Sequence, residues 1–216
     1  MGLRKSRALG CAPSKMDGSE HVFTVEASLD LPEEYSYKEY MSKVLDQGQE
    51  PICVACSLGT YINWKLNMQT GGKDDHIPGI SRLRDFFYAA GGGPIGMTYK
   101  DALYYLRHYG MITGDGNVKI KEYALVGSIL ALKNALIMNG PCLGALPVYN
   151  TIGRPEFWRN SGTGEFYGGH AISIIGWTKT GFIIRNSWGR SFGKDGYVEI
   201  PYNEFASSFY EIWTII

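Results

Sequence analysis

The sequence has no excess charge of either sign and no long apolar run. Its 216 residues include 21 Lys and Arg against 21 Asp and Glu, so no net field attracts nucleic acid or an anionic membrane surface. No stretch approaches the roughly 20 apolar residues of a transmembrane helix. The basic residues 1–7 are not followed by the apolar run of a secretory signal. We therefore expect neither nucleic acid nor membrane as a partner.

Cysteine is also sparse, which argues against a disulfide scaffold or a zinc site. The only closely spaced pair, Cys53 and Cys56, has no second Cys or His pair at ligand spacing, and Cys11 and Cys142 are isolated. We expect no metal and no cofactor. A reducing compartment, such as the cytoplasm, and a monomeric state are the simplest expectations.

The hydrophobic periodicity predicts helices in the first half of the chain and antiparallel strands in the second. This segregation favours an α+β fold with two lobes and a site in the cleft between them. We expect an N-terminal extension over residues 1–30, a helical lobe over about 31–125 and a β lobe over about 126–216. The predicted helices cover 53–68, 80–90, 99–109 and 126–138, with weak helical character over 35–44. The predicted strands cover 142–148, 171–177, 181–185, 196–200 and 208–216, with a glycine-rich loop over 150–169.

Cys53 falls at the start of the first predicted helix. Gly48 and Pro51 form a turn before it, and an apolar stripe begins at Leu58. The first N–H groups of a helix lack intrahelical partners, and the helix dipole is positive there, so a thiolate is stabilised and its pKa lowered. The alternative interpretation is a small buried apolar residue.

His170 and Asn186 lie on the two strands of one predicted hairpin. A pairing centred near Thr178 places position 170 opposite position 186. The Asn side-chain oxygen can then accept a hydrogen bond from the imidazole and fix its tautomer. A lone His is more often a core residue, but Cys53, His170 and Asn186 together form a nucleophilic set.

These segments resemble the papain-like cysteine proteases over about residues 31–216. The most specific match is the segment around Asn186, and the step of six residues from Gln47 to Cys53 is also kept. The matching segments are Gln47-Gly48, Cys53-Val54-Ala55, Gly169-His170-Ala171, Ile175-Gly176-Trp177 and Arg185-Asn186-Ser187-Trp188-Gly189.

The resemblance implies a papain-like fold with a β-barrel-like C-terminal lobe, and it implies roles for individual residues. Gln47 would contribute its side-chain amide to an oxyanion hole, together with the backbone N–H of Cys53. Cys53 would be the nucleophile, and His170 the general base and acid. Asn186 would orient His170, and Trp188 would cover the hydrogen bond between them. Substrate binding is implied for Gly96 (or Gly93), Gly169 and Trp188.

The sequence departs from the family pattern beside the nucleophile. Gln49-Glu50-Pro51-Ile52 stands where the family commonly has a disulfide-forming cysteine, and Val54 replaces an aromatic residue. In this respect the chain is similar to bacterial and viral members that lack the usual disulfides.

The resemblance therefore implies a cysteine peptidase that forms an acyl-enzyme with peptide or protein substrates. We expect an endopeptidase, although a loop over 150–169 that closed one end of the cleft would favour an exopeptidase. Two alternatives keep the scaffold: a catalytically inactive binding module, and an amidase or transpeptidase with the same site. Residues 1–30 are long enough to lay a short inhibitory strand across the cleft.

Overall fold

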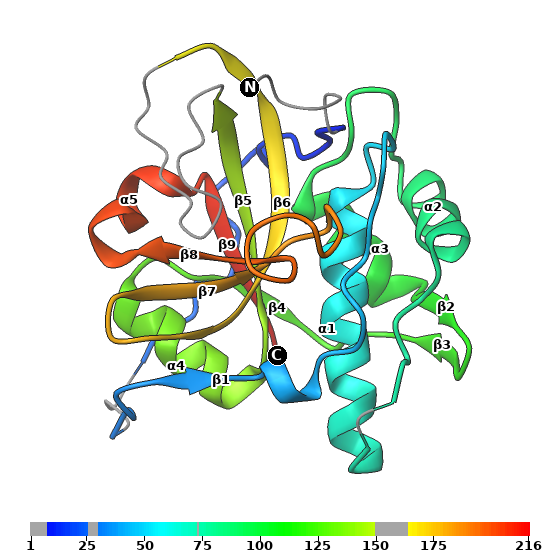
Figure 1. Cartoon of the computed structure of the whole chain (residues 1–216). Coiled ribbons are helices and arrows are strands. Elements are labelled where there is room, and N and C mark those ends of the chain that lie inside the picture. Colours follow the sequence, from blue (N-terminus) through cyan, green and yellow to red (C-terminus); the bar gives the residue numbers. More distant parts are fainter. Residues whose placement is uncertain (1–7, 26–29, 73, 150–163) are drawn as a thin grey trace.

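The computed structural model describes residues 8–25, 30–72, 74–149 and 164–216. Helices α1, α2 and α3 lie on one side of the long strands β5 and β6, and α4 and α5 lie on the other (Figure 1). The helices are α1 (Cys53–Thr70), α2 (Ile80–Ala89), α3 (Tyr99–His108), α4 (Ile129–Asn139) and α5 (Phe205–Ser208).

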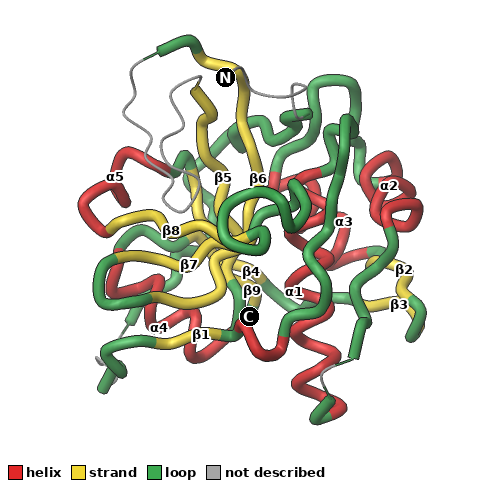
Figure 2. The backbone as a smooth tube through the Cα atoms, viewed as in Figure 1, coloured by secondary structure: helices red, strands yellow, loops and turns green. Residues whose placement is uncertain are grey.

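The strands form one antiparallel sheet of seven strands in the order β4-β9-β5-β6-β7-β8, with β1 paired to β6, and a separate β2–β3 hairpin (Figure 2). Within the described residues β4 and β8 do not pair, so this sheet is open and not a closed barrel. The α+β prediction is confirmed. The strands are β1 (Tyr35–Ser36), β2 (Met111–Thr113), β3 (Gly116–Val118), β4 (Tyr123–Leu125), β5 (Cys142–Tyr149), β6 (Phe166–Trp177), β7 (Gly181–Arg185), β8 (Tyr197–Pro201) and β9 (Glu211–Ile215).

Helix α1 is the central helix of the molecule. Every residue from Cys53 to Asn63 is buried, as expected for a helix covered on all sides. The helix packs against β6 on one side and α2 on another. It becomes more exposed toward its C-terminus, where Gly71 ends it in the left-handed conformation (φ 66°). The N-terminal turn of α1 is therefore held deep in the protein.

Two hydrophobic clusters flank this arrangement. One joins α1, α2 and α3 through side chains such as Leu58, Leu83 and Leu103. The other joins α4 to the sheet and includes Trp177 and Phe182, both fully buried. Burial of large side chains of this kind contributes about 1.5–3 kcal/mol each, so the core fixes the position of α1 relative to β6.

The weak helical character predicted over 35–44 is wrong. This segment contains strand β1 and a three-residue 3-10 helix, Lys38–Tyr40. The buried side chain of Tyr37 donates to the Leu136 carbonyl (2.8 Å), and its backbone N–H donates to the Ile175 carbonyl (2.9 Å). These tertiary contacts override a weak local preference.

Three predicted boundaries also shift. Helix α4 begins at Ile129, after the N-cap Ser128, because the N–H of Val126 bonds to the Ile212 carbonyl instead. The predicted last strand over 208–216 begins only at Glu211, as β9, because Ser208 is the final residue of the short helix α5. Strand β6 begins at Phe166, inside the predicted loop over 150–169; residues 150–163 of that loop lie outside the described residues.

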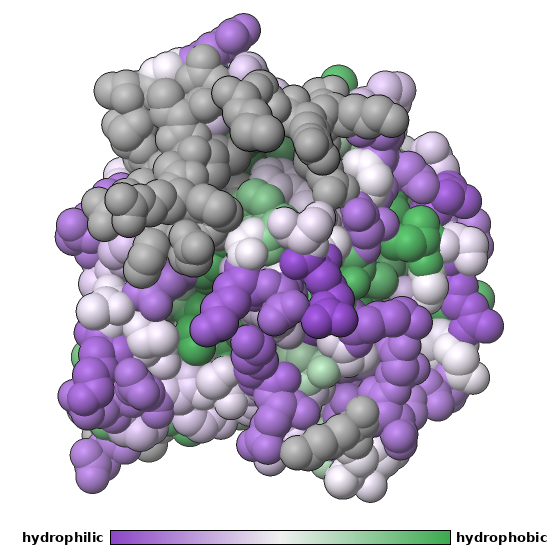
Figure 3. All heavy atoms as spheres, viewed as in Figure 1, coloured by the Kyte–Doolittle hydropathy of each residue, from purple (hydrophilic) through white to green (hydrophobic). Residues whose placement is uncertain are grey.

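The face of the molecule seen in Figure 1 carries mainly hydrophilic residues, with a smaller apolar patch near α2 (Figure 3). Across the described part of the chain, no helix combines the length and apolar character needed to cross a bilayer.

Candidate active site

Two loops meet at the N-terminus of α1 and place Cys53 between them. The turn at Gly48 (φ 59°) leads into the helix, whose N-cap is Ile52. The backbone N–H of Gln47 donates to the Ser187 carbonyl (2.9 Å), and Asp46 forms a β-bridge with Trp188. The stretch before the helix is thereby tied to the segment that follows β7.

His170 and Asn186 are in direct contact, as predicted. His170 lies on β6, and its Nε2 donates to Asn186 Oδ1 over 2.8 Å. The hydrogen on Nε2 makes Nδ1 the basic nitrogen of the neutral ring. This leaves Nδ1 as the atom that can take up a proton.

The predicted register of the hairpin is wrong by two residues. Trp177 pairs with Phe182, so the hairpin turns between residues 179 and 180 and not at Thr178; beyond a one-residue irregularity between Ile174 and Gly176, Ser173 pairs with Arg185. Extended by one residue, this register puts Asn186 opposite position 172 of β6. His170 lies two residues before that position on the same strand. The two side chains still meet because diagonal neighbours on one face of a sheet remain within reach.

Trp188 covers the imidazole. Its ring is stacked on that of His170, with centroids 4.4 Å apart and planes inclined by 25°. The Phe192 ring in turn packs edge-on against Trp188, with ring centroids 4.8 Å apart. The predicted contact of Trp188 with His170 is therefore present, and it keeps bulk water from one face of the imidazole.

Cys53 lies beside the same part of β6. Burial raises the pKa of its thiol, and the backbone N–H groups of Ala171, the residue after His170, of Gly10 and of Val54 lower that pKa. The thiol is fully buried, as is His170. Cys53 and His170 thus belong to one buried site at the junction of α1 and β6.

Residues 8–14, here called the N-terminal strap, cover this site. The Gln47 side chain donates through Nε2 to the Ala8 carbonyl (3.1 Å). The backbone N–H of Cys11 donates to the Gly169 carbonyl (3.1 Å). The backbone of Met97 donates to the Gly10 carbonyl (3.0 Å) and accepts from the Ala12 N–H (3.1 Å). The strap therefore occupies main-chain groups on both sides of Cys53.

These contacts place two of the predicted substrate-binding residues beside the strap. Gly169 contributes its carbonyl, and Gly96 (φ 98°) lies so close that an added Cβ would be 2.1 Å from the Gly10 carbonyl oxygen. Sequence reasoning missed Met97, which makes two of the backbone bonds. Main-chain donors and acceptors leave no side-chain signal, so only the position next to Gly96 pointed toward it.

Polar side chains hold the end of the strap and the residues that follow it against the rest of the protein. Both the N–H and the hydroxyl of Ser14 donate to Glu211 Oε1 over 3.0 Å. Lys100 Nζ contacts Asp17 Oδ2 (2.9 Å) and Glu20 Oε1 (2.6 Å). Glu211 is buried on β9, and burial raises the pKa of its carboxyl group despite the Ser14 hydrogen bonds.

Burial shifts the pKa of each of these two residues in the direction that favours its uncharged form. It lowers the pKa of His170 to about 4, although the Asn186 bond acts in the opposite direction. It raises the pKa of Cys53 to about 11, against the backbone N–H groups that lower it. The low thiol pKa predicted from the helix N-terminus is therefore wrong for the covered site, because desolvation outweighs the helix N–H groups.

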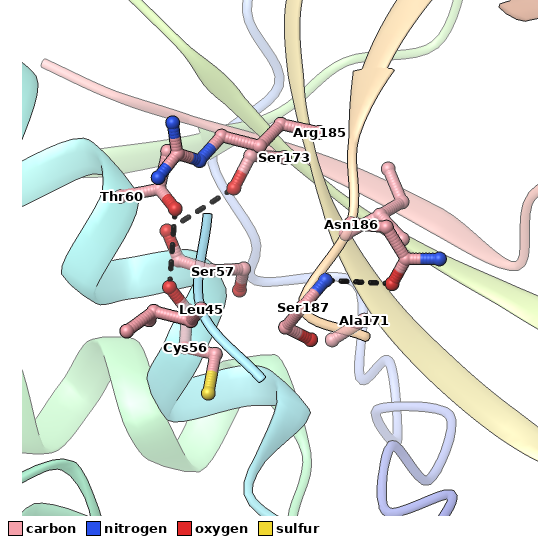
Figure 4. A pocket seen from close by; sticks show the side chains of 10 residues that line it. Leu45, Cys56, Ser57, Thr60, Ala171, Ser173, Arg185, Asn186 and Ser187 are labelled. Carbon is pink, nitrogen blue, oxygen red and sulfur yellow. Dashed lines mark hydrogen bonds between the residues drawn. The ribbon is translucent and has the colours of Figure 1, made fainter. Parts of the chain in front are cut away.

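A small polar pocket lies behind this site, between α1 and strands β6 and β7 (Figure 4). Its lining includes Ser57, Ser173 and Arg185 but neither Cys53 nor His170. The Arg185 guanidinium donates to the carbonyls of Ser42 (2.9 Å) and Lys43 (2.6 Å). It thereby holds the chain that leads to Gln47. Within the described residues no group of acidic, Cys and His side chains could hold a metal ion.

Comparison with known proteins agrees with this geometry. A family model described as papain family cysteine protease matches residues 103–211, just over half of the chain. The chain belongs to the papain family of cysteine proteases. The matched region contains His170 and Asn186, whereas Cys53 and Gln47 lie before it.

Individual papain-family relatives are distant. A gut-specific cysteine proteinase of Caenorhabditis elegans is 32% identical over 96 residues, covering 40% of this chain and 28% of that protein. Cathepsin K of Mus musculus is 25% identical over 235 aligned positions, covering 94% of this chain and 69% of that protein. The alignments thus span from about a quarter to about two thirds of these relatives.

Solved structures support the papain-like fold over nearly the whole chain. Xylellain, a cysteine protease from Xylella fastidiosa, superposes with a TM-score of 0.82 at 22% identity, covering 99% of this chain and 98% of that one. A procathepsin B from Trypanosoma congolense superposes with a TM-score of 0.80 at 20% identity, covering 97% and 87%. The predicted papain-like fold is confirmed.

Proposed function

We propose that this papain-family protein hydrolyses peptide bonds through a thioester intermediate formed on Cys53. The observation that carries the proposal is the 2.8 Å hydrogen bond from His170 to Asn186. The residue after His170 on β6, Ala171, has a backbone N–H that lowers the pKa of the Cys53 thiol, although burial raises that pKa more. This arrangement supports assigning Cys53 as the nucleophile, His170 as the base and Asn186 as the group that orients the base.

In the proposed reaction, His170 Nδ1 accepts the Cys53 proton, and the thiolate attacks the carbonyl carbon of the scissile bond. The imidazolium then protonates the leaving amine, and a thioester remains on Cys53. Water, deprotonated by His170, hydrolyses the thioester and releases the acid. Asn186 holds the ring in the tautomer required at each step, because its Oδ1 accepts the hydrogen on Nε2.

We assign Gln47 to the oxyanion hole. Its Nε2 already donates to a peptide carbonyl, that of Ala8 in the strap, over 3.1 Å. With the strap displaced, this donor and the Cys53 backbone N–H would face a substrate carbonyl. Loss of one such donor typically costs 10²–10³ in kcat.

We further propose that the strap restrains this activity. It bonds to Gln47 and Gly169 and passes over Cys53, so a substrate must displace it. Deleting residues 1–14 should then raise the initial rate of peptide hydrolysis. An unchanged rate would show that the strap does not limit access.

A second candidate, a catalytically inactive binding module, is favoured by the covered site itself. Cys53 and His170 are both fully buried and uncharged in this arrangement. In that case the strap would be a permanent part of the fold, and displacing it would expose no activity.

A library of internally quenched peptides tests the two candidates. Full-length protein, the variant lacking residues 1–14 and a Cys53→Ala variant would be assayed in parallel under reducing conditions. We expect hydrolysis by the first two, faster in the second, and none by Cys53→Ala. If neither Cys53-containing protein hydrolyses any peptide, the binding module becomes the better description. Transfer of the acyl group to an added amine in preference to water would instead indicate a transpeptidase.

A further inference from the structure

Ser187 makes three hydrogen bonds that join the two halves of the site. Its backbone N–H donates to Asn186 Oδ1 (2.7 Å), the same oxygen that accepts from His170 (Figure 4). Its carbonyl accepts from the Gln47 N–H (2.9 Å). Its hydroxyl donates to Gln47 Oε1 (2.6 Å). The residue is buried, with 6% of its surface exposed.

The surroundings of Gln47 define which end of its carboxamide faces the site. The carbonyls of Glu50 (2.8 Å) and Ala8 (3.1 Å) both accept from Nε2. A rotated carboxamide would bring Oε1 against these two acceptors. The Ser187 hydroxyl holds the opposite end, so the orientation is selected from both sides.

Two of the three groups that bond to the Gln47 carboxamide belong to the body of the protein, and the third belongs to the strap. Glu50 precedes α1 and Ser187 follows β7, whereas Ala8 belongs to the strap that a substrate must displace. Once the strap leaves, the Glu50 carbonyl and the Ser187 hydroxyl are the partners that remain among these three. Without the hydroxyl, the carboxamide would be held at one end only, and the buried Oε1 would lose its donor.

We infer that Ser187 is a positioning residue that aims the Gln47 amide at the oxyanion. This rests on the proposed peptidase function. Ser187 would stabilise the transition state through Gln47 and would not take part in generating the thiolate, since its link to Asn186 is a backbone N–H that a side-chain substitution leaves in place. A preorganised donor lowers the barrier more than a mobile one.

The inference predicts a specific pattern for Ser187→Ala. We expect kcat for a peptide to fall by about 5- to 50-fold, less than for loss of the whole donor, with KM changed by less than about threefold. Affinity for a peptide aldehyde, whose adduct with Cys53 carries an oxyanion, should fall by a similar factor. Alkylation of Cys53 by iodoacetamide forms no oxyanion and should proceed at the wild-type rate.

The test compares full-length wild type, Ser187→Ala, Gln47→Ala and the double variant, with Ser173→Ala as a matched control. Ser173 is a buried serine nearby whose hydroxyl donates to the Ser57 carbonyl and not to Gln47. The inference requires that the double variant be no slower than Gln47→Ala, because both changes remove one function. Equal kcat in wild type and Ser187→Ala, or effects that multiply in the double variant, would overturn it.

Two further outcomes separate this inference from the function on which it rests. Slower alkylation in Ser187→Ala would mean that the serine supports the Cys53–His170 pair instead of Gln47, and the inference would be wrong. Absence of wild-type hydrolysis would count against the peptidase proposal; the aldehyde affinities of wild type and Ser187→Ala would then still decide whether the serine positions Gln47.

Discussion

At the scale of single residues, the central feature is the pair that we propose to be catalytic, whose charged forms are disfavoured by burial. The Cys53 thiol and the His170 imidazole are both fully buried, and desolvation moves their pKa values away from each other, to about 11 and about 4. Proton transfer from Cys53 to His170 is therefore unfavourable in this buried arrangement. Access of water or substrate to this site is what would allow the charged pair to form.

The His170 pKa predicts how stability depends on pH. Between about 4 and the unfolded value of 6.5 the folded chain binds fewer protons than the unfolded chain at this residue, so stability falls as pH falls through this window. From pH 6.5 to 5 the loss should be about 2 kcal/mol. Denaturant unfolding of wild type and His170→Gln across this range measures it.

The comparison with His170→Gln isolates this residue from the carboxyl groups. Hydrogen bonds and ion pairs lower the pKa values of Asp17 and Glu20. Their contribution to the stability of the fold is therefore lost only at lower pH. The raised pKa of Glu211 acts with the opposite sign. If both proteins lose equal stability between pH 6.5 and 5, His170 is not buried in the neutral form.

At the scale of elements, the strap connects the N-terminal segment to α1, β6 and β9. It is held by backbone bonds to Met97 and Gly169 and by the Ser14–Glu211 contact. Such a segment opens with a free energy set by these few bonds, well below that of the core. Single substitutions should therefore change its opening without unfolding the protein.

Gly10→Val should displace the strap. A Cβ at position 10 would lie 2.2 Å from the backbone oxygen of Pro51, which cannot move without disturbing the start of α1. Overpacking of this kind costs about 1–3 kcal/mol, which corresponds to roughly a 5- to 150-fold increase in the open fraction. The initial rate of peptide hydrolysis would rise accordingly.

The matched control for this substitution is Gly127→Ala. An added Cβ there meets nothing within 4 Å, and the residue is not in the left-handed conformation. Both variants should keep a cooperative thermal transition. Equal hydrolysis rates in Gly10→Val and wild type would contradict a strap that limits access.

Ser14→Ala should loosen the other end of the strap. It removes the hydroxyl bond to Glu211 and the bond that the same hydroxyl accepts from the Lys100 N–H (3.2 Å). At about 1 kcal/mol for each bond, exchange of the Ala12 amide hydrogen should accelerate by about 5- to 30-fold. Ser19→Ala, which removes an exposed hydroxyl from the same extension, should leave this exchange unchanged. Equal protection in both variants would show that Ser14 is not an anchor.

At the scale of the whole molecule, the parts that could be predicted are those with a periodic or side-chain signal. The apolar stripe after Cys53 predicted α1, and the hairpin signal brought His170 close to Asn186. The exact register was not predicted, because the hairpin turns between residues 179 and 180, where Trp177 pairs with Phe182, and not at Thr178; the irregularity between Ile174 and Gly176, which leaves no mark in the sequence, then shifts the ladder by one residue. The same holds for Met97, which acts through its backbone.

The N-terminal segment was expected only in outline, as a short strand across the cleft, and its contacts were not predicted. Nothing in the local sequence of residues 8–14 indicates that they meet Gln47, Gly169 and Glu211, because these partners lie about 40 to 200 positions away. Burial reverses the expected pKa of Cys53, so tertiary packing that has no local signal in the sequence changed the electrostatic prediction. The lobe boundary near residue 125, the reducing compartment and the monomeric state stay predictions.

The most direct test of the central claim, that His170 activates Cys53, is intact-mass spectrometry during reaction with an epoxide-type thiol inhibitor near neutral pH. Wild type should gain one adduct, Cys53→Ala none, and His170→Ala should react at least about 100-fold more slowly. Equal labelling of wild type and His170→Ala, or labelling that persists in Cys53→Ala, would contradict the account.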